Sequence, residues 1–313
     1  MRKCLYCYNA LNNSEKDFHA ACSKKIFGQA TAPILPYSEE DLEPLAKEII
    51  SSQTAVTGVQ AKLSLHISAN KNKAEEKRFS IVGLWGAYIL KPPTILYPQL
   101  PEVEDLSMHL AEIAKIRTAD HSLIRLASGN LAYITKRFDR TKIGKIAMED
   151  MCQLSERMTE DKYHGSYEQI AKTILKFSKS PMLDVINFFE LVLFSYITGN
   201  ADMHLKNFSL LDHDKLGMTL SPAYDLVNTK LVNPKDDEDL ALTLNGKKKK
   251  IKKHDFIKAM STLNLDNKQQ ENIFNKFQKA MPEWLAFIDR SFLSNEYKKE
   301  YKAIVAERLK NCR

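Results

Sequence analysis

The sequence of 313 residues predicts an α+β protein whose front half is rich in strands and whose back half is helical. Between residues 51 and 136, short apolar runs alternate with polar breaks, which is typical of an antiparallel sheet. Beyond about residue 140, the apolar residues recur with helical spacing instead. Strands followed by helices indicate two lobes with a cleft between them. A short segment rich in cysteine and histidine precedes both lobes.

We expect three parts along the chain: a small Cys/His module over residues 1–30, a sheet-rich lobe over 31–138 and a helical lobe over 139–313. A serine before acidic residues marks a helix start, so a helix should run from Ser38 to about Ile50. The expected strands cover 61–68, 88–91, 123–126 and 131–135. The further expected helices cover 102–117, 167–176, 182–198, 256–263, 268–280 and 296–309.

Composition excludes several classes of protein. A hydrophobic fraction of 44% and a charged fraction of 27% argue against a disordered chain and against a coiled-coil rod. A formal charge of +7 is too small to select nucleic acid or an acidic partner. No uncharged apolar stretch approaches the ~20 residues of a spanning helix, and the N-terminus carries no secretory signal. We therefore expect no membrane partner. Five cysteines in so long a chain form no disulfide framework, so we also expect a cytoplasmic protein.

The N-terminal module carries four candidate metal ligands. Cys4 and Cys7 are separated by two residues, and so are His19 and Cys22. Three thiols and one imidazole in two close pairs suit a tetrahedral structural zinc site, which orders a short segment without a large core. The alternative is that reduced cysteines pack, together with the aromatic residues of the module, against the rest of the chain. Elemental analysis separates the two interpretations.

The most informative segment runs from Gly199 to Leu211 and follows a strongly apolar helical pattern. Its polar side chains are Asn200, Asp202, His204, Lys206 and Asn207. Polar residues at alternate positions before an apolar strand predict a loop stiffened by side-chain hydrogen bonds. Residues 216–220 would return as the second strand of a hairpin that leads to Asp225.

These residue types suit phosphoryl transfer. That reaction needs a carboxylate to orient the attacking hydroxyl, metal ions across the phosphates and cations near the developing charge. An Asp and an Asn five residues apart, then an Asp beyond a hairpin, is the spacing of base and metal ligands in protein kinases. Asp202 would be the catalytic base and Lys206 would contact the γ-phosphate, while Mg²⁺ would be held by Asn207 and Asp225. The alternative is a polar turn whose Asp and Asn side chains cap backbone groups.

Two motifs in this region, GNADMHLKNFS at 199–209 and SPAYDL at 221–226, resemble the HipA family of bacterial serine/threonine kinase toxins. Further matches in the order of the family lie at 56–62, 89–93, 136–140 and 149–154. The resemblance covers about residues 35–310. It implies a two-lobed, protein-kinase-like fold and ATP- and Mg²⁺-dependent phosphorylation of serine or threonine. Only ~30 unusual residues precede the kinase core, so the chain is similar to the short, HipT-like subtype that lacks the N-terminal subdomain.

The resemblance also assigns an ATP site. The loop at Thr57 and Gly58 corresponds to the loop that covers the phosphates, where backbone amides meet phosphate oxygens. Lys91 corresponds to a strand lysine that contacts the ATP phosphates. The other positions of the nucleotide site in the family correspond to Lys136, Phe138, His204 and Tyr224. Of these, Lys136 and Phe138 would meet adenine at the hinge, and the family often has Glu at the position of Lys136.

Regulation by autophosphorylation is a further implication of the resemblance. The family carries its phosphorylated serine three residues before the loop glycine, where this chain has Ala55. The hydroxyl residues that remain available are Thr57, Thr54 and Ser52. A phosphoryl group there would add about −1.5 to −2 charges beside the ATP phosphates, so that repulsion would expel the loop and block nucleotide binding.

The partners that the resemblance implies are proteins. Family members of known target phosphorylate aminoacyl-tRNA synthetases and thereby stop translation. Antitoxin partners would include a separate small protein equivalent to the missing subdomain and a DNA-binding antitoxin. We expect no direct contact with nucleic acid, because no helix interleaves aromatic and basic residues.

Two other functions fit parts of the sequence. A small-molecule phosphotransferase of the antibiotic or sugar kinase type shares the Asp-x4-Asn arrangement, although the matches before residue 160 are particular to the toxin family. A non-catalytic nucleic-acid-binding module would use the cysteine cluster and the positive charge. Labelled ATP in a cell lysate tests the first alternative, and salt-dependent DNA affinity tests the second.

Overall fold

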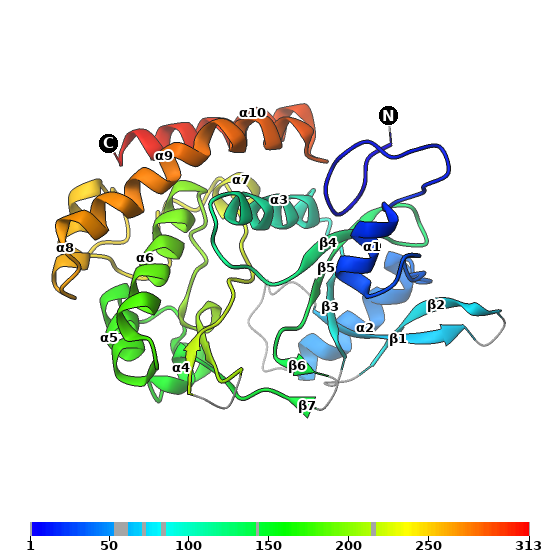
Figure 1. Ribbon diagram of the computed structural model, residues 1–313, viewed down its shortest axis with the longest axis horizontal. Helices are drawn as coiled ribbons and strands as arrows, with labels where there is room; N and C mark the ends of the chain where they lie inside the picture. Colours follow the sequence, from blue (N-terminus) through cyan, green and yellow to red (C-terminus); the bar gives the residue numbers. More distant parts are fainter. Residues whose placement is uncertain are drawn as a thin grey trace. The chain divides into compact units, whose positions relative to one another are not determined.

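The computed structural model describes residues 2–52, 62–70, 73–82, 86–141, 144–213 and 217–312. The chain divides into two compact units (Figure 1). Unit 1 comprises Met1–Asp105, Ala119–Phe138 and Arg290–Phe292. Unit 2 comprises Leu106–Thr118, Asp139–Asp289 and Leu293–Arg313. Unit 1 contains the larger sheet and unit 2 contains most of the helices, which confirms the predicted α+β class.

Among the described residues, unit 1 is built on a five-stranded antiparallel sheet with the order β2-β1-β3-β5-β4 (Figure 1). The strands are β1 (Leu63–Asn70), β2 (Lys73–Ile81), β3 (Tyr88–Lys91), β4 (His121–Arg125) and β5 (Leu131–Lys136). The prediction for 88–91 was correct in both bounds, whereas β2 was not predicted. Lysine and glutamate dominate the sequence of β2 and are depleted in strands, so its pairing with β1 had no local signal.

The core of unit 1 unites the sheet with the N-terminal helices α1 (Ala20–Phe27) and α2 (Glu39–Ser52). Phe27 of α1 contacts Phe79 of β2 and Tyr88 of β3, with ring centroids 5.7 and 6.1 Å apart. Cys4 and Tyr6 belong to the same buried cluster. The N-terminal segment over residues 2–27 therefore packs on the core of this unit.

Unit 2 surrounds one apolar helix, α6 (Pro181–Ile197), which is hydrophobic on nearly all sides and therefore buried. The helix α3 (Leu100–Ile113) contributes its second half to this unit. The other helices are α4 (Met151–Leu154), α5 (Tyr167–Phe177), α7 (Thr229–Val232), α8 (Lys253–Ser261), α9 (Asn267–Arg290) and α10 (Asn295–Lys310). Single 3-10 turns form at η1 (Thr159–Asp161) and η2 (Leu205–Asn207).

Short strands complete unit 2. A three-stranded sheet has the order β10-β9-β8 and consists of β8 (Met148–Asp150), β9 (Ser209–Leu211) and β10 (Thr219–Leu220). The pairing of β9 with β10 confirms the predicted hairpin. A smaller pair joins β6 (Arg140–Thr141) to β7 (Gly144–Lys145). No helix in the described ranges is both long and apolar enough to cross a membrane.

Two predicted helix ends differ from the structure by four residues or more. The helix expected at 102–117 ends at Ile113, because Lys115 takes a left-handed conformation with φ +60°. The helix expected to stop at 280 continues to Arg290 through Pro282. Beyond the proline, Trp284 is fully buried and its indole N–H donates to the Leu110 carbonyl at 2.7 Å. Burial of this last part of α9 outweighs the unfavourable proline.

We expect Trp284→Ala to lower the free energy of unfolding by about 3–5 kcal/mol, because it removes a large buried side chain. Trp284→Phe keeps most of the apolar volume and removes only the indole hydrogen bond, since the Leu110 carbonyl still accepts the Ala114 N–H at 3.1 Å; we expect a loss of about 0.5–1.5 kcal/mol. Leu183→Ala on α6 is the control, because Leu183 is 59% exposed. Urea unfolding followed by circular dichroism measures all three. Equal effects of Trp284→Ala and Leu183→Ala would contradict this account of α9.

Candidate functional site

The predicted polar loop begins where α6 ends. Thr198 closes the helix by donating its hydroxyl to the Phe194 carbonyl at 2.9 Å. Gly199 follows with φ +73°, in the left-handed region. A Cβ atom at this glycine would lie 2.9 Å from Asn228 Oδ1 and 3.0 Å from Ile304 Cγ2. Both the backbone conformation and the space therefore require glycine at the point where the chain leaves the helix.

Asparagine side chains hold the backbone of Asp202 on both sides. The Asp202 N–H donates to Asn200 Oδ1 at 3.0 Å, and Asn207 Nδ2 donates to the Asp202 carbonyl at 2.9 Å. The predicted stiffening by side-chain hydrogen bonds is confirmed. Backbone capping thus explains Asn200 and the Nδ2 group of Asn207. It does not explain the side chains of Asp202, His204 and Lys206.

The Asp202 carboxylate contacts a tyrosine that the sequence analysis missed. Tyr163 donates its hydroxyl to Asp202 Oδ1 at 2.6 Å, and its ring lies edge-on to His204 at 5.0 Å. Burial raises the pKa of Tyr163, and the charges of Asp202 and Asp225 raise it further. Tyr163 therefore stays protonated and remains a donor to Asp202. Nothing in the local sequence around residue 163 indicates this contact.

His204 is buried beside the same two carboxylates. Burial lowers the pKa of its imidazole, while the charges of Asp202 and Asp225 act in the opposite direction. Its buried Nδ1 atom has no hydrogen-bond partner among the described residues. His204 is therefore a neutral group, and both Asp202 and Asp225 lie close enough to act on it. Asp225 itself has a left-handed backbone with φ +60°.

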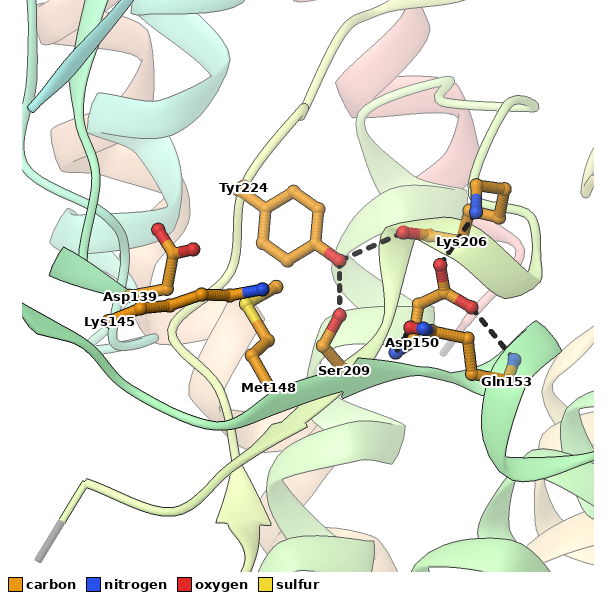
Figure 2. Close-up of a pocket in the computed structure, with 8 residues that line it drawn as sticks. All are labelled: Asp139, Lys145, Met148, Asp150, Gln153, Lys206, Ser209 and Tyr224. Carbon is orange, nitrogen blue, oxygen red and sulfur yellow. Dashed lines mark hydrogen bonds and ion pairs between the residues drawn. The ribbon is translucent and has the colours of Figure 1, made fainter. Parts of the chain in front are cut away.

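Lys206 and Tyr224 line a pocket of about 250 Å³ in unit 2 (Figure 2). Tyr224 donates its hydroxyl to the Lys206 carbonyl at 2.8 Å, and the same oxygen lies 2.6 Å from Ser209 Oγ (Figure 2). Burial raises the pKa of Tyr224, and the charges of Asp150, Asp225 and Asp139 add to that rise. The other lining residues are Asp139, Lys145, Met148, Asp150 and Gln153.

Asp150 is the partner of Lys206 and was not predicted as a site residue. Lys206 Nζ lies 2.7 Å from Asp150 Oδ2 (Figure 2). The other oxygen of Asp150, Oδ1, accepts the Gln153 N–H at 3.0 Å and caps α4. The sequence shows the capping pattern, an Asp followed three residues later by Gln. It does not show the lysine, which lies 56 residues further along the chain.

Lys91 of unit 1 has an acidic partner that the sequence analysis also missed. Its Nζ lies 2.5 Å from Glu104 Oε1 on α3, and these side chains are only 5% and 0% exposed. The ammonium group also lies 5.4 Å from the centre of the Tyr133 ring. A charged pair this deeply buried needs its partner, because an unpaired charge there would be strongly unfavourable. Position 104 carries no distinctive local pattern.

The remaining predicted residues are placed as follows. Lys136 is exposed, and its Nζ lies 3.9 Å from Asp120 Oδ2. Phe138 is half-buried and is the last residue of a segment of unit 1. Thr54, Thr57 and Gly58 lie outside the described residues, and so does the side chain of Ser52. The predicted zinc ligands come together in unit 1, where their ligand atoms lie within 4.8 Å of one another; they are Cys4, Cys7, His19 and Cys22. Asp202, His204, Lys206, Asn207, Tyr224 and Asp225 all belong to unit 2.

Comparison with known proteins gives a family. The model of the HipA-like C-terminal domain matches residues 54–285. Y4dM of Sinorhizobium fredii, described as a candidate kinase, is 33% identical over 187 residues, which is 56% of this chain and 45% of that protein. A candidate kinase of Haemophilus influenzae is 30% identical over 232 residues, which is 69% of this chain and 63% of that protein. The chain thus spans 45 and 63% of the length of these two relatives.

Solved structures show the same fold. HipA, in the Shewanella oneidensis toxin–antitoxin complex of HipA, HipB and operator DNA, matches with a TM-score of 0.68 and 20% identity. That match covers 85% of this chain and 70% of the other. The Helicobacter pylori proinflammatory kinase CtkA matches with a TM-score of 0.54 and 17% identity, over 78% of this chain and 92% of the other. The predicted kinase-like fold is confirmed.

Gly199→Ala should destabilise the protein more than Gly246→Ala. Both glycines have nearly the same φ, +73° and +75°, so both variants bear the left-handed strain of about 1–2 kcal/mol. Only Gly199 also faces close neighbours, whereas nothing lies within 4 Å of a Cβ at Gly246. Chemical unfolding should place Gly199→Ala at least about 1 kcal/mol below the control variant. An equal loss in both would show that the space around Gly199 is unimportant.

The lowered pKa of His204 predicts a pH-dependent stability. The imidazole of His204 binds a proton more weakly in the folded protein than in the unfolded chain. The contribution of the neutral imidazole to the free energy of unfolding is therefore complete above the unfolded pKa of about 6.5. It is lost as the pH falls through that value towards the lower pKa of the folded state. Unfolding measured at about pH 7.5 and 5.5 should lose less stability in His204→Gln than in the original protein. His164→Gln, at an exposed histidine, should behave like the original protein.

Proposed function

The chain belongs to the family of HipA-like C-terminal domains, and from this premise we propose that it is an ATP- and Mg²⁺-dependent kinase. The observation that carries the proposal is the loop of unit 2 in which Asp202 is held by Asn200 and Asn207. This arrangement fixes the carboxylate that would orient the attacking hydroxyl, and Asp225 lies close to the same tyrosine and histidine. Candidate kinases among the relatives support the same conclusion.

The donor set of this loop fits Mg²⁺. Magnesium prefers oxygen ligands from one or two carboxylates and completes its shell with water and substrate phosphates. Asn207 and Asp225 supply an amide oxygen and a carboxylate, and the Nδ2 group of Asn207 is already used on the backbone. Oδ1 of Asn207 is therefore the atom suited to the metal. The metal held there would supply the positive charge that offsets the negative charge of the phosphates during transfer.

Asp202 would accept the proton of the attacking hydroxyl. The Tyr163 hydroxyl occupies Oδ1 and, because its pKa is raised, donates to the ionised carboxylate. Oδ2 would then serve the substrate. A base held at both neighbouring backbone groups keeps its position during the reaction, which is the main requirement in phosphoryl transfer.

Two lysines would meet the phosphates of ATP. Lys206 is oriented by Asp150 in the pocket, with its carbonyl held by Tyr224, and would contact the γ-phosphate. Lys91 forms a buried ion pair with Glu104 on a helix, which is the pairing that protein kinases require for activity. We propose that adenine contacts the backbone near Lys136 and Phe138, that His204 and Tyr224 line the nucleotide site, and that the loop with Thr57 and Gly58 covers the phosphates.

The proposed substrate is a serine or threonine of a protein, and the proposed role is that of a toxin in a toxin–antitoxin system. The solved structure of HipA with HipB and operator DNA supports an antitoxin partner. The proposed partners are a DNA-binding antitoxin and a separate small protein equivalent to the N-terminal subdomain of longer family members. An aminoacyl-tRNA synthetase is the proposed target. Autophosphorylation at Thr57, Thr54 or Ser52 would regulate the enzyme.

Labelled ATP incubated with the protein and a bacterial lysate tests this function. The original protein should transfer label to protein serine or threonine, and Asp202→Asn should reduce the rate at least about 100-fold, because it removes the base. This isosteric change still offers Tyr163 an acceptor, so that folding is preserved. Asp237→Asn, at an exposed aspartate of unit 2, is the control and should transfer label normally.

Other outcomes of the same experiment have defined meanings. Label found only in small metabolites would identify a small-molecule phosphotransferase instead. Full transfer by Asp202→Asn would exclude Asp202 as the base. The original protein would be checked by mass spectrometry to carry no antitoxin. If it is folded and still transfers no label in the presence of Mg²⁺, the proposed kinase activity is contradicted.

A further inference from the structure

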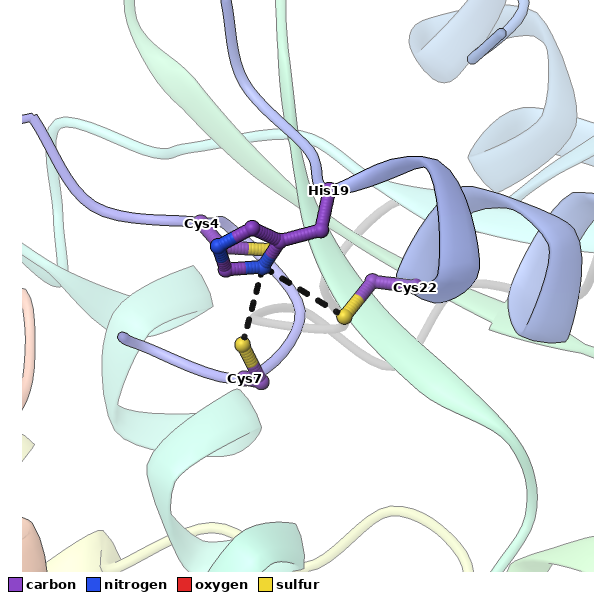
Figure 3. Close-up of side chains that lie close together, drawn as sticks. All are labelled: Cys4, Cys7, His19 and Cys22. Carbon is purple, nitrogen blue, oxygen red and sulfur yellow. Dashed lines mark hydrogen bonds between the residues drawn. The ribbon is translucent and has the colours of Figure 1, made fainter. Parts of the chain in front are cut away.

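The N-terminal quartet has the spacing of a tetrahedral metal site. His19 Nδ1 lies 3.4 Å from Cys7 Sγ and 3.7 Å from Cys22 Sγ (Figure 3). Cys4 Sγ completes the group, in which all ligand atoms lie within 4.8 Å of one another. Zinc bonds of about 2.3 Å to sulfur and 2.0–2.1 Å to nitrogen give a sulfur–nitrogen edge of roughly 3.5 Å in a tetrahedron. The two observed distances match that edge.

The tautomer of His19 suits a metal at Nδ1. The other ring nitrogen, Nε2, lies 3.0 Å from the carbonyl oxygen of Ala10, which can only accept a hydrogen bond. Nε2 therefore carries the hydrogen and Nδ1 carries the lone pair. A metal-binding histidine commonly donates its second N–H to a carbonyl in this way, which fixes the ring and its tautomer.

Two backbone elements hold the ligand pairs. Cys4 and Cys7 lie in a tight turn in which the Tyr8 N–H donates to the Cys4 carbonyl at 2.9 Å. Tyr8 leaves this turn with φ +63°, a conformation that is unfavourable for a side chain of its size. On the other side, His19 immediately precedes α1 and Cys22 lies in the first turn of that helix. The turn and the helix bring both pairs together from segments 11 residues apart.

The thiols of Cys4, Cys7 and Cys22 belong to or lie against the apolar cluster of unit 1, but two neighbouring aromatic residues also have partners of their own. Tyr8 donates its hydroxyl to Asp105 at 2.6 Å, and its ring lies edge-on to Phe292. Phe18 packs against Phe27. Of the four ligand residues only Cys4 is buried, whereas the other three are half-buried. Simple packing therefore leaves the convergence of three thiols on one imidazole nitrogen unexplained.

We propose that Cys4, Cys7, His19 and Cys22 bind one zinc ion in a structural site. Four protein ligands close the tetrahedron, which leaves no position for water or substrate and so excludes a catalytic role. The thiols would bind as thiolates, releasing their protons to solvent as the metal enters. The site is independent of the proposed ATP chemistry, because none of these residues belongs to unit 2.

The zinc site would fasten the N-terminal segment to the edge of the sheet. The Leu5 carbonyl, next to Cys4, accepts the Leu123 N–H at 3.3 Å and the Ser122 hydroxyl at 3.2 Å. Asp17, two residues before His19, accepts Arg125 Nε at 3.0 Å. These contacts lie along β4, which is an edge strand. An uncovered edge invites pairing with other chains, so the metal would protect the sheet by holding its cover in place.

Zinc content of the purified full-length protein, measured by inductively coupled plasma mass spectrometry, tests the proposal. We expect about one zinc ion per chain, and less than about 0.2 in Cys22→Ser and in Cys7→Ser. Cys152→Ser is the matched control, because Cys152 is a buried cysteine of unit 2, and it should keep its zinc. Cobalt exchanged into the site should give the intense visible absorption of a tetrahedral thiolate complex.

A second measurement does not depend on the variants. Removal of zinc from the original protein with a chelator should speed amide hydrogen exchange in residues 121–125, and added Zn²⁺ but not Mg²⁺ should restore protection. Less than about 0.2 zinc per chain in the folded original protein would overturn the proposal, as would iron in its place. Unchanged exchange after complete zinc removal would overturn the fastening of β4.

Discussion

The position of one carboxylate depends on how the chain leaves its most apolar helix. Helix α6 is buried on nearly all sides, and Gly199 turns the chain at its end where no larger residue fits. The side chains of Asn200 and Asn207 then fix the backbone N–H and the backbone carbonyl of Asp202. The packing of α6 in the core thus fixes where the loop begins, and the two asparagine side chains fix its backbone conformation. A mobile polar loop on the same core would not hold a base in one place.

The charged pairs of the protein are better explained by function than by stability. Lys91 and Glu104 are almost completely buried, whereas Lys206 is 35% exposed beside the mostly buried Asp150. Removing two charges from water is unfavourable, and an apolar pair of equal volume would often stabilise a protein more. A lysine kept charged inside the protein has a clear use if it meets phosphate. This cost supports the kinase proposal independently of the family relationship.

The sequence was informative where chemistry and periodicity are local, and silent where partners are distant. Strand 88–91 and the hairpin after residue 208 could be predicted from apolar runs. The partner of Lys91 is 13 residues away on a helix, and that of Asp202 is 39 residues away. Strand β2 and the continuation of α9 through Pro282 depend on tertiary packing, which overrides local propensity.

The N-terminal segment shows how a few side chains compensate for a small hydrophobic contact. The buried apolar side chains of residues 2–27 are few for a segment of this length; they are Cys4, Leu5, Tyr6, Tyr8, Ile26 and Phe27. Ordering such a chain opposes folding by about 1–2 kcal/mol per residue, so further bonds are needed. Backbone contacts to β4 supply some of them. A metal bound by residues near both ends of the segment would supply the rest, because it would bind the folded protein and not the unfolded chain, so that its binding free energy adds to the free energy of folding.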